Sequence, residues 1–201
     1  MKDPDLIFRP EIPADFRAVE TLVRNAFWNV YRPGCMEHFV LHTLRNDPDF
    51  VPELSLVLEQ SGVLLGQAAG VRAVIQLQNG GTLPVLNLGP LCIAPSHQRQ
   101  GLGRRLLNTM LEKAAALGFG AAVLEGDPAF YGPSGFVPGK TVGVCYADDP
   151  TAEYFLIKEL RPGFLAGVRG TYRDPEGYFV CQTHPQEFAA YEAQFGAAPH
   201  P

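Results

Sequence analysis

Apolar residues recur every three or four positions in two long stretches, the spacing that places them on one face of a helix. The first stretch covers residues 12–27 and has Pro13 near its start, where proline suits the first helical turn. The second begins at Leu102 and ends before Gly118, a residue type that commonly follows a last turn. The predicted apolar faces are Phe16, Val19, Leu22, Val23, Ala26 and Phe27, and Leu102, Leu106, Leu107, Met110, Leu111 and Ala114.

Three further helices are predicted from weaker signals. A less regular one covers Met36 to Leu44 and ends near Asp47-Pro48. A short one begins at Asp127-Pro128, with aspartate as the N-cap and proline in the first position. The last is opened by Thr183-His184-Pro185 and covers about residues 184–196.

Apolar runs bounded by turn residues predict the strands. These runs cover residues 6–9, 55–59, 64–76, 84–93, 121–125, 141–146, 154–159 and 178–182. The turns at residues 60–62 and 79–81 join the second strand to the third and the third to the fourth. Inside the fourth strand stands Gly89-Pro90, and because proline cannot donate to a ladder we expect a bulge or splay there.

The order of these elements predicts a mixed α/β fold with a largely antiparallel central sheet, splayed at its fourth strand and covered by helices on both faces. The chain of 201 residues favours a single domain, residues 1–201, with its core at about 6–180.

Composition narrows the functional classes. The chain is 46% hydrophobic and 18% charged, with a formal net charge of −5. This balance argues against nucleic acid as the main partner, since phosphate binding depends on a basic surface. No run approaches the roughly 18 to 20 apolar residues of a membrane span. The first ten residues carry acids and prolines where a signal peptide would be basic and then apolar, so we expect a cytoplasmic protein.

One segment has a charge opposite to that of the whole chain. Residues 60–111 contain no Asp or Glu but carry Arg72, Arg99, Arg104 and Arg105. The last two fall in the first turn of a predicted helix, an end that is already electropositive. Gly101 and Gly103 allow a ligand to approach the backbone closely, so this turn is a candidate phosphate or pyrophosphate site. The alternative is that the arginines are solvated and the glycines only form a turn.

Several motifs, taken in order, resemble those of the GNAT superfamily of N-acetyltransferases. Residues 98–103, QRQGLG, match the Q/R-x-x-G-x-G/A signature, and Leu91-Cys92-Ile93-Ala94-Pro95 matches the end of the fourth strand before it. Tyr131 followed by Gly135-Phe136 resembles the Y-x-x-x-G-F segment. The sequence is most similar to a predicted bacterial subgroup with a Gly-Pro-Leu strand and a Gly-Asp-Pro segment. Arg9 to Asp15 and the run ELRPGFLAGVRG fit that subgroup.

The resemblance implies acetyl-CoA, or another acyl-CoA, as co-substrate and no metal. It places the pyrophosphate on the loop and on the N–H of Arg104, and the pantetheine arm along the end of the fourth strand. The implied cofactor-binding residues are Leu91, Cys92, Ile93, Gln98, Arg99, Gln100, Gly101, Leu102, Gly103 and Arg104. The implied reaction is direct acetyl transfer to a primary amine through a tetrahedral intermediate.

Such a transfer needs an oxyanion donor, an acid for the leaving thiolate and a neutral amine. The backbone N–H of Leu91, just past the expected splay, is the candidate donor, and Tyr131 is the candidate acid unless it is only a packing aromatic. The expected fourth strand has no carboxylate, so Glu125 is the nearest candidate base, acting through water. A solvated strand end is the plainer interpretation of Glu125, and the amine can also lose its proton to solvent.

We interpret the other chemically reactive side chains, the cysteines and histidines, as structural and not catalytic. The four cysteines (Cys35, Cys92, Cys145 and Cys181) lie far apart in the sequence, which favours reduced, mostly buried thiols over zinc. Cys92 adjoins the expected thioester position, but a core thiol is favoured over a nucleophile. His38 and His42 have metal-ligand spacing without a third ligand, so we interpret them as a solvated face. We assign His97 to a turn.

The sequence gives its weakest signal for the residues that bind the acceptor. Trp28 lies off the apolar stripe of the first helix and is a candidate pocket wall, together with Tyr31; packing against the second helix is an equal alternative for Trp28. We expect the acceptor to be a small-molecule or protein amine. The sequence does not decide whether the protein forms a homodimer. Two alternatives remain: a non-catalytic acyl-CoA-binding sensor or partner module, and another nucleotide-binding protein if the loop match is accidental.

Overall fold

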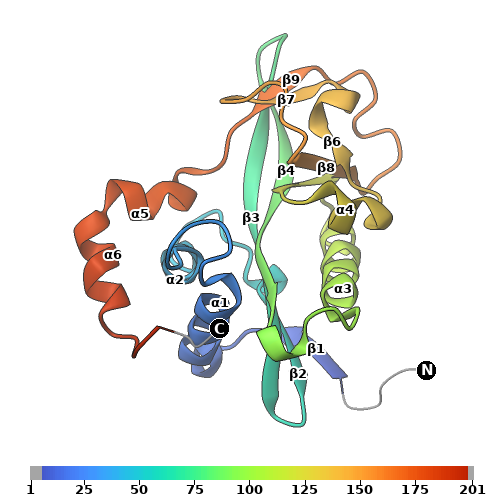
Figure 1. The fold of residues 1–201 in the computed structure, drawn as a ribbon. Helices are drawn as coiled ribbons and strands as arrows, with labels where there is room; N and C mark the ends of the chain where they lie inside the picture. The colour runs from blue at the N-terminus through green and yellow to red at the C-terminus, as the bar shows by residue number, and fades with distance from the viewer. Residues whose placement is uncertain (1–5, 199–201) are drawn as a thin grey trace. The chain divides into compact units, whose positions relative to one another are not determined.

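The computed structural model describes residues 6–198, and these form two compact units (Figure 1). The first unit takes in the described chain up to Ala69, then Pro90–Leu107 and the chain from Pro175 onward. The second unit consists of Gly70–Gly89 and Asn108–Asp174. Strands β3 (Val63–Leu77) and β4 (Thr82–Ile93) and helix α3 (Leu102–Ala116) each run from one unit into the other.

Among residues 6–198, nine strands form one sheet in the order β1-β2-β3-β4-β5-β8-β6, with β9 beside β3 and β7 beside β9. Most of the pairings are antiparallel, while β4 with β5 and β7 with β9 are parallel. The fold is therefore mixed α/β with a mostly antiparallel sheet and helices around it, as the sequence predicted. The remaining strands are β1 (Leu6–Pro10), β2 (Leu56–Gln60), β5 (Ala121–Glu125), β6 (Val137–Pro138), β7 (Val144–Tyr146), β8 (Phe155–Glu159) and β9 (Gly170–Tyr172).

The helices of the first unit pack against one another beside its strands. Figure 1 shows α5 and α6, at the orange-to-red end of the chain, beside α2. These helices are α1 (Phe16–Phe27), α2 (Glu37–Leu44), α5 (Val180–Thr183) and α6 (Pro185–Glu192), with 3₁₀ turns at Pro13–Asp15, Pro52–Leu54, Pro95–His97 and Glu176–Phe179. No helix among the described residues combines the length and apolar character that crossing a membrane would need.

Arg9 and Asp15 connect β1 to α1. The Arg9 guanidinium donates to both Asp15 carboxylate oxygens at 2.6 and 3.0 Å, and the backbone N–H of Ile12 donates to the same carboxylate at 2.9 Å. The hydrogen bond from Arg9 holds the pKa of Asp15 below its ordinary value, against the opposing effect of burial. The spacing of these residues in the sequence therefore has a structural basis at the start of the first helix.

The second unit has its own apolar core. Phe155 on β8 stacks on Tyr172 on β9, with ring centroids 5.0 Å apart. Around them, buried side chains of β4, β5, β7 and β8 close the core, among them Val85, Val123, Val144 and Ile157. Helix α4 (Pro128–Tyr131) and the 3₁₀ turns Gly132–Ser134 and Gly139–Val142 complete this unit.

Two strand predictions need correction, and two short strands were missed. Residues 178–182 are helical, in the 3₁₀ turn before α5 and in α5 itself, because a five-residue apolar run does not distinguish a strand from a buried helical turn. Within 141–146 only Val144–Tyr146 is a strand, since Gly143 at φ +88° ends a 3₁₀ turn. The short strands β6 and β9 were not predicted, because two or three residues carry no readable period.

The fourth strand shows the expected irregularity. In the part of the chain that the structure describes, the ladder between β4 and β5 joins Leu86 to Ala122 and Asn87 to Val123, and it ends before Gly89. Gly89 has φ +155°, a value that side chains disfavour. The parallel pairing therefore stops where Gly89-Pro90 predicted a splay.

Candidate functional site

The candidate phosphate loop lies in the first unit, between β4 and α3. Arg99 adopts a left-handed conformation at φ +59° and Gly101 does so at φ +80°. The side chain of Gln98 folds back so that its Nε2 donates to the Ile93 carbonyl at 3.1 Å, which ties the loop to the end of β4. Nothing lies within 4 Å of the position where a Cβ of Gly101 would stand. The loop is thus sharply turned, anchored at one end and open above its glycine.

Helix α3 begins directly after this loop. The first helical bond is donated by the N–H of Arg105 to the Gly101 carbonyl at 3.2 Å, so the preceding N–H groups belong to the open first turn of the helix. The first turn holds no acidic residue. Arg104 is exposed there, while the guanidinium of Arg105 lies 5.6 Å from the Phe8 ring centroid. Dipole and side-chain charge both favour an anion at this end.

The end of β4 supplies the other predicted cofactor contacts. Leu91 is half-buried, whereas Cys92 and Ile93 are buried. The Cδ1 atom of Ile93 lies 2.5 Å from where a Cβ of Gly66 would stand, so only glycine at that position lets β4 pack this closely. Burial raises the pKa of the Cys92 thiol, and the nearby Cys35 raises it further. Cys92 is therefore suited to the core and not to nucleophilic attack.

Tyr131 ends helix α4 in the second unit. Asp127 caps this helix, since its carboxylate accepts from the Ala129 N–H at 2.8 Å. The Tyr131 ring meets Phe130 and Phe136 edge to face, with centroid distances of 4.8 and 5.7 Å. A Cβ on Gly126 would lie 2.4 Å from Tyr131 Cε2, so the ring lies directly against the backbone that follows Glu125. The candidate acid and the candidate base belong to the same unit.

Glu125, at the end of β5, is exposed yet strongly perturbed. The pKa of its carboxyl is raised to about 7, first by burial against the surrounding protein and then by a hydrogen bond to Asp174 and the charge of that residue. A hydrogen bond from Tyr146 acts in the opposite direction. Glu125 therefore lies exposed at the end of its strand, as the plainer interpretation expected, and it also contacts a second carboxylate there.

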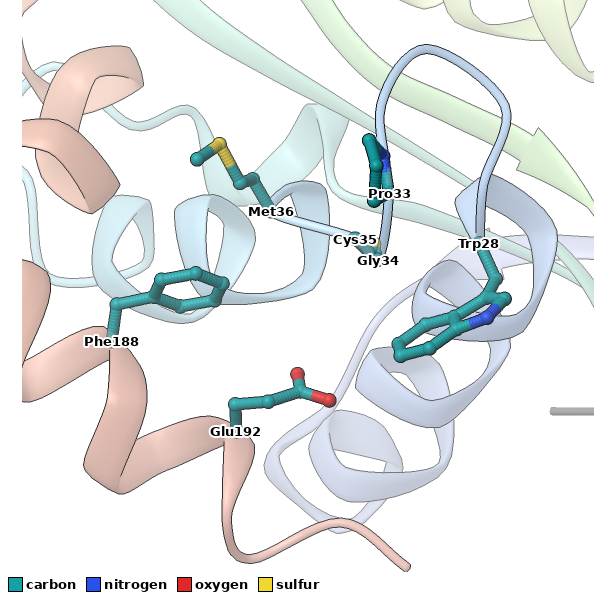
Figure 2. A pocket seen from close by; sticks show the side chains of 7 residues that line it. All are labelled: Trp28, Pro33, Gly34, Cys35, Met36, Phe188 and Glu192. Atoms are coloured by element: carbon teal, nitrogen blue, oxygen red, sulfur yellow. The ribbon is translucent and has the colours of Figure 1, made fainter. Parts of the chain in front are cut away.

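Trp28 lines a pocket of about 200 Å³ in the first unit (Figure 2). Figure 2 shows the Glu192 carboxylate between Phe188 and Trp28, facing into this space. The other lining residues come from the loop between α1 and α2: Pro33, Gly34, Cys35 and Met36. The Arg24 guanidinium lies 4.3 Å from the Trp28 ring centroid. The other predicted acceptor residue, Tyr31, is 69% exposed and is not part of this lining.

His38 is fully buried, which corrects the prediction that it lies on a solvated face. Its Nε2 lies 2.8 Å from Glu192 Oε2, and the other Glu192 oxygen accepts from Arg24 at 2.6 Å. Burial lowers the pKa of His38 to about 4, so the ring is neutral near pH 7 beside the Glu192 carboxylate. His42, with 45% of its side chain exposed, contacts Glu20 at 2.9 Å. The two histidines thus serve two separate carboxylates.

The sequence signal was strong for the loop and weak for the acid–base cluster. Asp174 lies 49 positions after Glu125, and no motif connects them. Glu192 in the pocket was also missed, because a single acid on a short helix looks like an exposed one. Only the folded chain brings such residues to their partners.

Comparison with known proteins identifies the family. The model of the GNAT acetyltransferase family matches residues 21–134, which is more than half of the chain, so this chain belongs to that family. The family is one of acyltransferases, in agreement with the resemblance seen in the sequence.

Individual relatives agree with this assignment. The chain is 29% identical over 165 residues to the uncharacterized N-acetyltransferase YhbS of Escherichia coli K12, covering 82% of this chain and 93% of that protein. The crystal structure of E. coli YhbS in complex with CoA matches with a TM-score of 0.76 and 27% identity, over 87% of this chain and 92% of that one. A Brucella melitensis GNAT acetyltransferase in complex with acetyl-CoA matches with a TM-score of 0.69 and 24% identity, over 86% and 97% of the chains.

Proposed function

We propose that this protein transfers an acetyl group from acetyl-CoA to a primary amine, by direct attack through a tetrahedral intermediate. The observation that carries the proposal is the open, left-handed loop of residues 98–103 in front of an acid-free helix start. In a member of the GNAT family, this arrangement fits a coenzyme diphosphate. The two structural relatives that contain CoA or acetyl-CoA support the choice of donor.

The binding roles follow from the chemistry of each segment. Backbone N–H groups from Gly101 to Arg104 would hold the diphosphate, and Arg104 would add charge. The half-buried Leu91 and its neighbours Cys92 and Ile93 would take the pantetheine arm along β4. The pocket beside Trp28 would receive the carbon skeleton of a small-molecule or protein amine, and its volume suits a small group.

The catalytic roles concern protons and the oxyanion. The acceptor ammonium gives one proton to Glu125 and becomes nucleophilic, and the Leu91 N–H donates to the oxyanion that forms. When the C–S bond breaks, Tyr131 protonates the departing thiolate and recovers a proton from the amide nitrogen. The products are the N-acetyl amine and free CoA thiol, and Glu125 returns its proton to solvent. General acid–base groups of this kind typically contribute about 10²–10⁴-fold to a rate.

A thiol-release assay with acetyl-CoA and a panel of primary amines tests the proposal. We expect the wild type to turn over at least one amine, and Tyr131→Phe to lower kcat roughly 100-fold with unchanged coenzyme affinity. Tyr178→Phe, a hydroxyl deletion in the 3₁₀ turn before α5, is the control and should behave like wild type. Tight coenzyme binding without any thiol release would instead favour a non-catalytic acyl-CoA-binding module, and equal rates for both tyrosine variants would exclude Tyr131 as the acid.

A further inference from the structure

A second carboxylate, Asp174, lies at the end of the β9 segment in the second unit. Three donors converge on it. Tyr146 Oη donates to Oδ2 at 2.7 Å, Tyr172 Oη donates to Oδ1 at 3.1 Å, and Asn87 Nδ2 lies 3.4 Å from the same Oδ1. The parallel register of β7 and β9 sets Tyr146 opposite Tyr172, which aims both hydroxyls at one carboxylate. Asp174 is therefore fixed in place as an acceptor.

Glu125 is the more exposed partner of this pair. It is hydrogen-bonded to Asp174 and to Tyr146, and it is exposed to solvent where Asp174 is only half-buried. Two carboxyl groups in hydrogen-bond contact are held together best when one of them carries a proton. Because Asp174 already accepts from three donors, Glu125 is the member that takes the proton. Glu125 also adjoins Gly126, on which the Tyr131 ring lies.

We infer that Asp174 is a positioning residue that holds Glu125 as the proton acceptor for the incoming ammonium group. The inference rests on the proposed acetyl transfer and adds to it a specific device. One proton moves from the acceptor nitrogen to a Glu125 oxygen, and the hydrogen bond between Glu125 and Asp174 retains it. The pair then changes from two negative charges to one, which relieves the repulsion between the two carboxylates.

The other charged and titratable groups around Glu125 are few. The Tyr146 hydroxyl on β7 has a single proton to share between Asp174 and Glu125. Tyr154, just before β8, is close enough that the charge of Glu125 helps to raise the pKa of its phenol. Asp148 and Asp149 also raise the pKa of Tyr154, but Asp148 is paired with Arg173 at 2.7 Å. Asn87 on β4 is neutral. Burial is the largest cause of the raised pKa of Glu125, and Asp174 is the neighbouring group that adds most to it.

Two substitutions should shift the pKa of Glu125 in opposite directions. Asp174→Asn removes the neighbouring charge while keeping an acceptor for Tyr146 and Tyr172, so the pKa of Glu125 should fall by at least about one unit. Tyr146→Phe keeps the ring but removes a hydrogen bond that favours the Glu125 carboxylate, so the pKa should rise. A merely structural role would not predict shifts of opposite sign. Glu153→Gln is the control, because Glu153 is exposed and pairs with Lys140 at 2.6 Å.

The experiment is an NMR titration of the Glu125 side-chain carboxyl carbon in the free protein, followed by kcat/KM against pH with an accepted amine. We expect a titration near pH 7 in wild type and in Glu153→Gln, a lower one in Asp174→Asn and a higher one in Tyr146→Phe. The rising limb of kcat/KM should move in the same directions. An ordinary glutamate titration in wild type, or no shift in Asp174→Asn, would overturn the inference.

The two readouts separate this inference from the proposed function. If Glu125 titrates as expected but no amine is acetylated, the acetyl-transfer proposal fails and the catalytic role falls with it, while the Glu125–Asp174 contact stands. If amines are acetylated and the rising limb of kcat/KM stays in place in Asp174→Asn, the acetyl transfer stands and the role of Asp174 is refuted.

Discussion

At the scale of single residues, the most demanding group in the first unit is Arg45. Its guanidinium donates to Glu11 at 2.6 Å and to Glu20 at 2.5 Å, and it lies 4.1 Å from the Phe16 ring centroid. The side chains of Arg45, Glu11 and Glu20 are only 6%, 2% and 6% exposed. Burial disfavours the charge of Glu20, but the nearby Tyr191 hydroxyl, the hydrogen bond with His42 and the charge of Arg45 keep its pKa below the ordinary value.

Removing this arginine should therefore be strongly destabilising. Arg45→Met leaves two buried carboxylates without their cation, and we expect a loss of about 3–5 kcal/mol in the free energy of unfolding. Arg173→Met removes an exposed pair with Asp148 and should lose at most about 1 kcal/mol. Urea unfolding of both variants gives the comparison. Similar urea midpoints for the two variants would contradict the expectation that the buried ion pairs of Arg45 matter more for stability than the exposed pair of Arg173.

Single residues also show how much of the candidate site could be predicted from the sequence. The open approach to the Gly101 backbone and the cap formed by Asp127 follow from local chemistry, and both are found as expected. The burial of His38 and the pairing of Glu125 with Asp174 depend on residues far away in the chain. Local patterns contain no information about such contacts, so they were missed.

At the scale of elements, the packing of α2 against α6 depends on a neutral histidine. His38 lies among the rings of Phe188, Tyr191 and Phe195, with centroid distances of 6.2, 5.5 and 4.9 Å. Its pKa of about 4 in the folded protein is below the ordinary value of about 6.5 expected when unfolded. The unfolded chain therefore binds a proton in this interval that the folded protein does not bind.

The sign of the resulting pH dependence follows directly. The stability associated with neutral His38 is fully present above about pH 6.5. It is lost as the pH falls from there toward 4, because the unfolded state gains a proton in this interval and the folded state does not. His38→Gln keeps a neutral polar group beside Glu192 but does not titrate, so its unfolding free energy should decline less steeply between pH 7 and 4.5.

Denaturant unfolding at several pH values measures both slopes. His184→Gln, at an exposed histidine before α6, should follow the wild-type slope. An equally steep decline in His38→Gln would show that the buried ring is not responsible.

Elements also mark the limit of periodicity as a guide. The long helices α1 and α3 and the hairpin of β3 and β4 were predicted within a few residues, because each buries one regular face. Residues 178–182 and the two or three residues of β6 and β9 were not, since their structure is decided by the neighbours they pack on.

At the scale of the whole molecule, charge is distributed unevenly along an acidic chain. The net charge is −5, yet residues 60–111 carry four arginines and no acid. A polyanionic coenzyme would be drawn to that segment, while the acidic remainder would disfavour nucleic acid. Expectations of a cytoplasmic location, a single domain and a homodimer stay predictions, as does the identity of the amine.

The most direct test of the account is calorimetric titration of the protein with acetyl-CoA, using wild type and Arg104→Glu at low and high salt. We expect one coenzyme to bind per chain and the binding to weaken at high salt. Arg104→Glu should lower the affinity for acetyl-CoA about tenfold or more. Lys113→Glu makes the same charge change nine residues further along α3, about 13 Å away, and should bind like wild type. An absence of binding heat, or equal affinities for Arg104→Glu and wild type, would show that the coenzyme diphosphate does not bind at the loop of residues 98–103 and the start of α3.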